Sequence, residues 1–342
     1  MKFGPVPIAE AEGKILGHNV AGIDGRRVLR KGKPLTAADL DLLRRLGRRA
    51  VYVAEIEADD VEENTAAGRI AAAAAGAHVR LSGPATGRVN LHAAALGVLR
   101  VDVPRLAQLN ECAGVTLATL PAQTAVNAGK MVATLKILPY AIPAAAVRQA
   151  EAIGNQPAPL LRLDPLTPKR AGLILSGSPA VQDRIIHSFQ TALRARLAAL
   201  NADLVAIDFV PLDDEDDERR LAQTIRAHLR AAHDLIILAG ETAIMDRHDI
   251  APRAVEQAGG TVICFGAPVD PGNLLMLAYH GAVPILGAPG CARSPKDNIV
   301  DLVLPRLLVG DRLTAADIVA FGHGGLLEDV PERPAPRARL TP

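Results

Sequence analysis

Three loops rich in small residues are the parts of this sequence that could do chemistry. They cover residues 176–179, 240–249 and 287–295. Glycine lets a backbone approach a ligand closely, and N–H groups at the start of a helix favour phosphate oxygens. Any one loop could be only a tight turn between a strand and a helix. The three together predict a pocket for a phosphate-bearing ligand, and its candidate binding residues are Ser176, Gly177, Ser178, Gly240, Glu241, Thr242, Ala243, Gly287, Pro289, Gly290, Cys291, Arg293 and Ser294.

Two aspartates in the middle loop, Asp246 and Asp249, are the candidate catalytic and metal-binding residues. Mg²⁺ prefers one or two carboxylates together with phosphates and water. Glu241 could join them or face solvent. The alternative for Asp249 is a helix cap, because it precedes Ile250 at the start of a helical segment.

Other polar residues near the loops allow two interpretations each. Arg293 could bind a phosphate or form a surface ion pair. Ser294 before Pro295 predicts a helix N-cap at the pocket. Cys291 beside a helix start would have a lowered pKa, or would be inert filler. His248 could carry protons, His228 and His233 are interpreted as structural, and the acidic run 213–218 as a solvated face.

The segment that carries the loops alternates strands and helices. Apolar runs predict strands over 171–176, 203–210, 234–239, 261–265 and 283–286, and amphipathic spacing predicts helices over 181–200, 215–232, 249–258 and 296–308. Continuous apolar strands between such helices indicate an α/β domain over 171–320, with a mainly parallel sheet in a three-layer arrangement. Ligands bind such sheets beyond the carboxyl ends of the strands, where the loops lie.

The preceding residues differ in texture. Residues 1–77 predict a smaller α+β segment, with a capping box at Thr36 and Asp39, a helix ending at Gly47, a strand over 50–54 and a helix over 59–75. Residues 78–150 predict a mostly β module, and 151–170 a proline-rich extended linker. Residues 321–342 are expected to form a flexible tail.

Composition excludes several classes of protein. The 342 residues include 38 basic and 37 acidic side chains and 2% aromatic residues. The near-neutral charge and the scarcity of aromatic side chains argue against binding of nucleic acid. No apolar run is long enough to predict a membrane span, and the N-terminus does not have the pattern of a signal peptide. Three widely spaced cysteines favour a reducing cytoplasm.

Ordered motifs at these loops resemble the molybdenum-cofactor (molybdopterin-binding) domain shared by molybdopterin adenylyltransferases and molybdotransferases. Residues 234–240 are similar to the strand before the family's Gly-Gly-Thr/Val loop, and 248–252 to an Arg-Asp-Val-Thr-Pro segment. Residues 269–273 and 287–290 resemble Lys-Pro-Gly-Lys and Gly-Leu-Pro-Gly loops, which adds Pro271 and Gly272 to the candidate binding residues. Asp246 falls where molybdotransferases place an aspartate, and residues 28–36 look similar to another molybdotransferase segment.

The chain departs from the family pattern at the loops themselves. Glu241 replaces the second glycine and Ala243 a glycine or serine, while Asp270 replaces a lysine and Cys291 an asparagine. A carboxylate at position 241 would repel a phosphate unless a metal intervenes. The chain therefore looks like a divergent relative of the molybdopterin adenylyltransferases and molybdotransferases.

The resemblance implies a molybdopterin ligand, with Mg²⁺ and ATP if the domain catalyses adenylyl transfer or molybdate insertion. A second hypothesis is a non-catalytic carrier that serves a molybdoenzyme or another cofactor-biosynthesis protein, and family analogy allows a homodimer. A third, a nucleotide enzyme unrelated to molybdenum, lacks a Walker lysine and a GxGxxG fingerprint.

Overall fold

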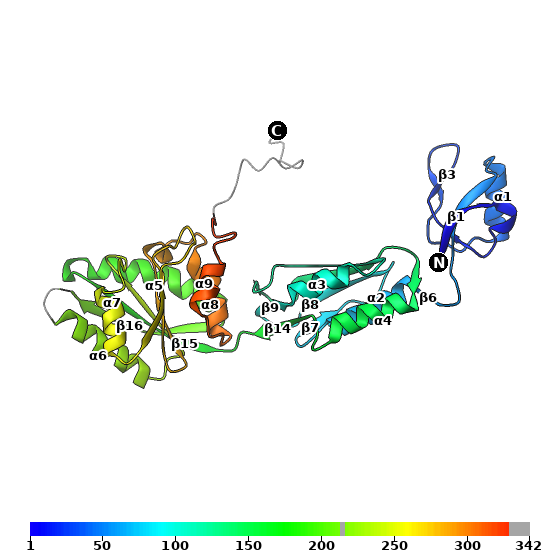
Figure 1. Cartoon of the computed structure of the whole chain (residues 1–342). Helices are drawn as coiled ribbons and strands as arrows, with labels where there is room; N and C mark the ends of the chain where they lie inside the picture. Colours follow the sequence, from blue (N-terminus) through cyan, green and yellow to red (C-terminus); the bar gives the residue numbers. More distant parts are fainter. Residues whose placement is uncertain (213–215, 328–342) are drawn as a thin grey trace. The chain divides into compact units, whose positions relative to one another are not determined.

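The computed structural model describes residues 1–212 and 216–327. The chain forms two compact units, Met1–Asp164 and Pro165–Pro342 (Figure 1).

The N-terminal unit begins with a small antiparallel sheet in the order β1-β5-β2, beside a two-stranded ribbon of β3 and β4. Its elements are β1 (Lys2–Pro7), β2 (Ile15–Leu16), β3 (Val20–Ala21), β4 (Arg27–Leu29), α1 (Ala37–Arg45) and β5 (Ala50–Glu55). The predicted capping box is confirmed, since Thr36 and Asp39 bond each other's backbone N–H groups. Gly47 has a φ of +70°, the left-handed geometry expected at this helix end.

The rest of the unit packs around one aliphatic core formed by side chains between Ala66 and Leu163. Its elements are β6 (Asp60–Glu62), α2 (Glu63–Ala74), β7 (Val79–Leu81), β8 (Arg88–Ala93), β9 (Gly97–Val101), α3 (Val103–Asn110), β10 (Val115–Thr119), β11 (Ala125–Val126), β12 (Met131–Ile137), β13 (Ala141–Pro143), α4 (Ala144–Asn155) and β14 (Leu161–Pro165). Helix α2 packs on α4 and β8. The helix predicted for residues 59–75 therefore belongs to the same core as the strands that follow it.

The C-terminal unit is built on a six-stranded sheet in the order β16-β15-β17-β20-β19-β18. Its elements are β15 (Lys169–Gly177), α5 (Gln182–Ala199), β16 (Ala202–Pro211), α6 (Asp217–Arg230), β17 (Leu235–Gly240), α7 (Ile250–Gln257), β18 (Thr261–Phe265), β19 (Met276–His280), β20 (Val283–Gly287), α8 (Ile299–Leu308) and α9 (Ala315–Ala320). Short 3₁₀ turns η2 (Pro179–Val181) and η3 (Gly290–Arg293) follow β15 and β20.

The predicted α/β fold with a mainly parallel sheet is confirmed. Strand β15 pairs in parallel with β16 and with β17, and β17 pairs in parallel with β20. Strand β19, which runs antiparallel between β20 and β18, was not predicted. It was missed because residues 276–280 follow a Pro-Gly turn directly, without a helix between them and β18.

Helices cover both faces of this sheet (Figure 1). On one face, α6 and α7 pack over Ile174, Ile236 and Ile285 in a single aliphatic core. Leu173 and Leu175 alternate with Ile174 along β15 and are equally buried, so they face the opposite side, where α5 packs on β15 and β16. The three layers hold the sheet rigid and leave its edge loops to carry function.

Three expectations change in this unit. Ser294 does not cap a helix: α8 begins at Ile299, where Asn298 and Asp301 form the capping box. The expected tail is held as far as Leu327, because the N–H of Leu327 and the carbonyl of Gly325 both bond Asp270, and residues 328–342 lie outside the described residues. Of the acidic run, residues 213–215 also lie outside; Asp217 is buried and pairs with Arg220, so it is not a solvated group.

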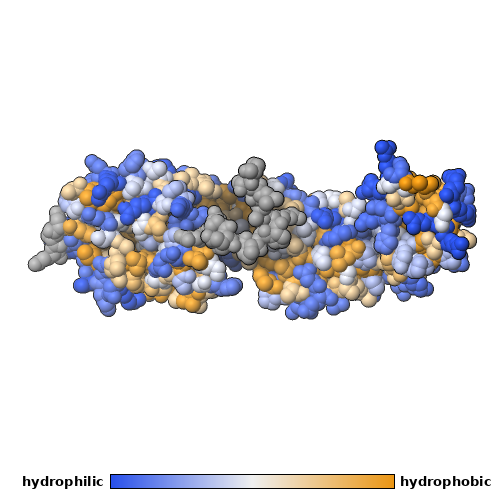
Figure 2. All heavy atoms as spheres, turned by 90° about the horizontal axis from the view of Figure 1, so that it is seen from above, coloured by the Kyte–Doolittle hydropathy of each residue, from blue (hydrophilic) through white to orange (hydrophobic). Residues whose placement is uncertain are grey.

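In the described part of the chain, no helix has the length and apolar character needed to cross a membrane. On the face seen in Figure 2, apolar residues are interspersed with polar ones over both units. Scattered apolar residues of this kind are ordinary for a protein surface.

A histidine pair is buried beneath β15. Nδ1 of His233 lies 3.1 Å from Nδ1 of His228, and Nε2 of His228 lies 2.7 Å from Oδ2 of Asp208. A carboxylate only accepts, so His228 donates from Nε2 to Asp208, and the two Nδ1 atoms of His228 and His233 share one hydrogen bond. A Cβ at Gly172 would lie 2.0 Å from the His228 ring, which explains the glycine within this strand.

Burial lowers the pKa of His233, and the neighbouring His228 and Arg170 lower it further. Asp208 and Asp234 raise this pKa by smaller amounts, so the net shift is downward. The folded state therefore binds fewer protons than the unfolded state in the range below pH 6.5, the unperturbed value. The contribution of His233 to the free energy of unfolding is therefore fully present above pH 6.5, and it is lost as the pH drops from there towards the lowered pKa.

We therefore predict that the C-terminal unit loses stability on acidification, and that His233→Asn makes the loss smaller while costing on the order of 1 kcal/mol at neutral pH through the weakened bond to His228. Hydrogen exchange of peptides from β17, measured at about pH 7.5 and about pH 5.5, checks this against His187→Asn, an exposed histidine in the same unit. An unchanged pH dependence in His233→Asn would contradict the assignment.

Candidate functional site

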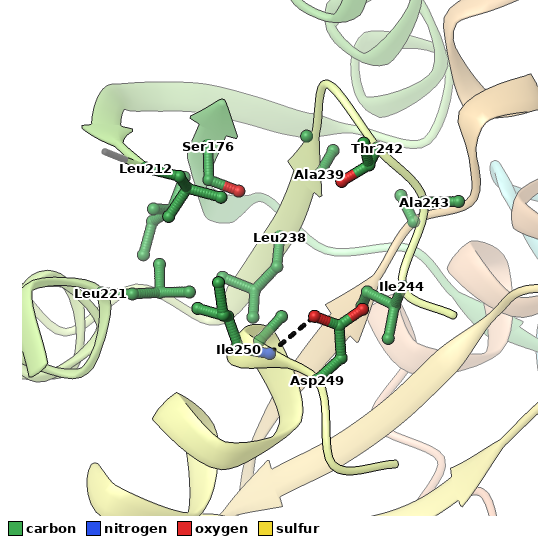
Figure 3. Close-up of a pocket in the computed structure, with 14 residues that line it drawn as sticks. Ser176, Leu212, Leu221, Leu238, Ala239, Thr242, Ala243, Ile244, Asp249 and Ile250 are labelled. Carbon is green, nitrogen blue, oxygen red and sulfur yellow. Dashed lines mark hydrogen bonds between the residues drawn. The ribbon is translucent and has the colours of Figure 1, made fainter. Parts of the chain in front are cut away.

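A pocket lies at the carboxyl edge of the parallel strands, on the face covered by α6 and α7 (Figure 3). Its enclosed volume is about 70 Å³. The described residues that line it come from the ends of β15 and β17, from the connections after β16, β17 and β20, and from α6 and α7: Ile174, Ser176, Leu212, Leu221, Leu238, Ala239, Gly240, Thr242, Ala243, Ile244, Asp249, Ile250, Ala251 and Ala288.

The pocket has an apolar floor and a polar rim. Aliphatic side chains such as Leu221 and Leu238 form the floor, while the polar side chains of Ser176, Thr242 and Asp249 lie around them (Figure 3). Among the described lining residues, Asp249 is the one with a formal charge, and that charge is negative. Such a lining suits a flat ring that offers N–H donors better than it suits a phosphate.

The first and middle loops touch each other directly. In the parallel ladder Ser176 is opposite Gly240, and the N–H of Glu241 donates to the carbonyl of Ser176 at 2.8 Å. The N–H of Ser178 donates in turn to Oε2 of Glu241, also at 2.8 Å. This bond to the Ser178 backbone is the main cause that lowers the pKa of Glu241, and Arg184 adds to it. The two loops were predicted to meet, and the structure brings them together.

The two aspartates of the middle loop serve its backbone. Asp249 caps α7: its carboxylate accepts from the N–H of Ile250 at 2.7 Å and of Met245 at 3.0 Å. Asp246 accepts from the N–H of His248 at 2.8 Å. The cap interpretation of Asp249 is therefore confirmed. Each carboxylate is turned to N–H groups of its own loop. Among residues 1–212 and 216–327, no group of three or more acidic, histidine or cysteine side chains could hold a metal ion.

Most of the third loop turns away from the pocket. Ala288 reaches the lining, and Gly287 packs against Ile244, whose Cδ1 would lie 2.7 Å from an added Cβ. The next residues form η3, which packs on α5. Arg196 of α5 holds this turn through the carbonyls of Ala292, Ser294 and Lys296 and through Asp301. Pro289, Gly290, Cys291 and Ser294 are accordingly not pocket residues.

Arg293 lies on the α5 face. Its Nε donates to the carbonyl of Gly290 at 2.9 Å, and its guanidinium stands 5.6 Å from the centre of the Phe189 ring. There it borders a second, open groove of about 510 Å³ along α5, lined also by His187, Thr191 and Ala195. The structure therefore separates Arg293 from the Ser176 and Gly240 loops, with which the sequence grouped it.

The lowered pKa considered for Cys291 is wrong. Burial raises the pKa of this thiol, and the helix start expected beside it lies further along the chain, at Ile299. The remaining interpretation, a small filler side chain, agrees with its position in η3.

Pro271 and Gly272 support α8 instead of lining the pocket. The N–H of Ile299 donates to the carbonyl of Pro271 at 3.1 Å, and a Cβ on Gly272 would lie 2.3 Å from Cγ2 of Ile299. The glycine is therefore needed for close packing at the start of this helix.

Sequence reasoning missed the apolar floor. Leu212 follows β16 and Leu221 belongs to α6, so the loop after the second strand also borders the pocket. The signal was available, because a strand that pairs in parallel beside β15 ends at the same edge. Ile244 lies within the middle loop and Ile250 directly follows it, but the polar residues between them were selected instead.

Comparison with known families gives two matches. Residues 172–309 match a family model described as "Probable molybdopterin binding domain". Residues 5–55 match one described as "Domain of unknown function". No curated protein matches the chain.

Solved structures of molybdenum cofactor biosynthesis proteins align weakly with this chain. A molybdenum cofactor biosynthesis protein from Pyrococcus furiosus aligns at 13% identity and a TM-score of 0.24, over 93% of this chain and 65% of that one, just under two thirds of its length. A molybdopterin biosynthesis protein from Pyrococcus horikosii aligns at 13% and 0.30, over 90% and 75%. Molybdenum cofactor biosynthesis protein B aligns at 14% and 0.30, over 41% and 94%. At these scores none of the alignments supports an argument about function.

The cap geometry predicts how α7 responds to substitution. Asp249→Ala removes the acceptor for Ile250 and Met245 and should destabilise the start of α7 by about 1 kcal/mol, whereas Asp249→Asn keeps an acceptor and should cost much less. Hydrogen exchange of the peptide that spans α7 measures both. Equal protection in Asp249→Ala and the unmodified protein would show that the carboxylate is not a cap.

Proposed function

We propose that this domain, whose residues 172–309 match the model of a probable molybdopterin-binding domain, binds molybdopterin, or a related intermediate of molybdenum cofactor biosynthesis, in the pocket between the loops after β15 and β17. The observation that carries the proposal is the lining itself. An aliphatic floor under a rim of hydrogen-bonding groups stands at the edge where α/β sheets bind ligands.

The pterin ring matches this lining in chemistry. It is flat, with an apolar face for Leu221 and Leu238, and it carries amino and ring N–H donors. The Asp249 carboxylate has acceptor capacity beyond its two backbone bonds, and the hydroxyls of Ser176 and Thr242 can both donate and accept. The anionic phosphate would then lie outward, towards the first loop.

The enclosed volume of about 70 Å³ is small beside the roughly 300–1,000 Å³ of typical ligand pockets. Loading therefore requires the middle loop to move outward from the first. The exposure of Thr242, Met245 and Asp246 favours this, because few packing contacts oppose the movement.

Two activities are compatible with such binding. For Mg²⁺-dependent adenylyl transfer or molybdate insertion, Asp246 and Asp249 would have to release the backbone N–H groups that they now bind and hold a metal ion beside ATP instead. A carrier needs only the pocket. The use of both aspartates by backbone N–H groups favours the carrier. Delivery to a molybdoenzyme or to another cofactor-biosynthesis protein, a homodimeric state and a cytoplasmic location belong to the same proposal.

The binding proposal predicts that pterin co-purifies with the protein. The full chain, expressed in a molybdopterin-producing host and purified anaerobically, should retain a fluorescent pterin after oxidation. Ala243→Phe places a ring in the pocket and should reduce retention by about tenfold or more. Met245→Phe adds a ring on the same loop at a side chain that is 67% exposed and outside the lining, so it should retain pterin normally. Equal retention by both variants would place the ligand elsewhere.

The carrier role predicts binding without turnover. With molybdopterin, ATP and Mg²⁺ supplied together, the protein should release no pyrophosphate above the level seen without pterin. Pyrophosphate release that depends on both pterin and Mg²⁺, and that is lost in Asp246→Asn, would establish the transferase instead.

A further inference from the structure

Glu241 stands at the contact between the two loops that form the candidate site. It directly follows β17, its side chain is exposed, and its Oε2 accepts the backbone N–H of Ser178 at 2.8 Å. Ser178 lies in the short connection between β15 and α5, 63 residues away in the chain. The carboxylate thus occupies a backbone donor of the first loop, a kind of group that also donates to phosphate oxygens.

The local packing leaves room for the carboxylate there. A Cβ on Gly177 would lie 2.8 Å from Cβ of Glu241 and 3.1 Å from its Oε2, so a larger residue would push Glu241 away. A Cβ on Gly240 would lie 2.9 Å from the carbonyl oxygen and from Oγ of Ser176. The two glycines allow the loops to approach until the carboxylate meets the Ser178 N–H.

The electrostatics of this position favour an anion. The backbone and side chain of Ser178 and the charge of Arg184 all lower the pKa of Glu241, so the side chain is ionised at neutral pH. A place that favours a carboxylate over its neutral form also favours other small anions.

We propose that Glu241 is an internal competitor for the anionic group of the ligand: its carboxylate fills the anion position at Ser178, and an anionic ligand enters only by displacing it. The inference rests on the proposed function for the identity of the ligand. The Glu241–Ser178 bond also ties the middle loop to the first, so the same displacement frees the middle loop to open the pocket.

This role explains why glutamate at position 241 is compatible with a phosphate-bearing ligand. When the site is empty the carboxylate satisfies a donor that would otherwise lack a protein partner. When the ligand arrives, the side chain turns out to solvent, which costs little because it is already exposed. The competition lowers affinity for small anions and selects ligands whose ring also binds the apolar floor.

The test uses inorganic pyrophosphate as the probe and the full chain labelled with ¹⁵N at serine. At neutral pH the Ser178 amide signal should differ between the unmodified protein and Glu241→Ala, and pyrophosphate should shift it in both. Glu241→Ala should bind pyrophosphate about tenfold more tightly, the effect expected on removing one charge-assisted competing bond. Glu241→Gln should fall between the two.

Glu256→Gln is the matched control, because it removes the same charge from exposed Glu256 on α7, which pairs with Arg247 and not with Ser178. It should leave pyrophosphate affinity unchanged. An unchanged affinity in Glu241→Ala, or a gain of the same size in Glu256→Gln, would overturn the proposal. Tighter pyrophosphate binding in Glu241→Ala together with no pterin retention by any variant would uphold the competitor role and reject the pterin ligand.

Discussion

The parallel pairing of β15 with β16 and with β17 is the constraint on which the whole site depends. It brings Ser176 opposite Gly240 on one side and opposite Val210 on the other, so that three connections distant in sequence end at one edge. A one-residue slip of register would turn the aliphatic floor residues to the opposite face of the sheet. Residues on both faces of β15 are buried, so a slip would move the side chains of each packed layer into the other. Neither layer is shaped for the side chains of the other, and the register is therefore fixed.

Given this edge, the chemistry of the site follows from which groups meet there. Backbone N–H groups in the loops need acceptors, and Glu241, Asp246 and Asp249 supply them within the chain. The acidic residues that suggest a metal site from sequence thus act first as partners of the backbone. The pocket beside them combines an apolar floor with hydrogen-bond acceptors. The pterin proposed as its ligand would place its anionic group at the first loop.

Local signals in the sequence predicted the features that depend on local geometry. The capping box at Thr36, the left-handed Gly47 and the helix cap at Asp249 follow from side-chain reach and backbone φ alone. The alternation of apolar strands and helices likewise indicated the parallel sheet. The path of the third loop could not be predicted, because it is fixed by Arg196 on α5, about a hundred residues earlier. Arg196 bonds two carbonyls of that loop and the carbonyl of Lys296 directly after it. The pocket floor is different, because the strand predicted over 203–210 already placed the connection that holds Leu212 at the same edge of the parallel sheet.

A structure of the full chain purified anaerobically with its bound pterin tests the account most directly. The account predicts the pterin ring over Leu221 and Leu238 between the loops after β15 and β17, with the Glu241 carboxylate turned away from the N–H of Ser178. A pterin found in the groove along α5 beside Arg293, with the Glu241–Ser178 bond intact, would contradict it.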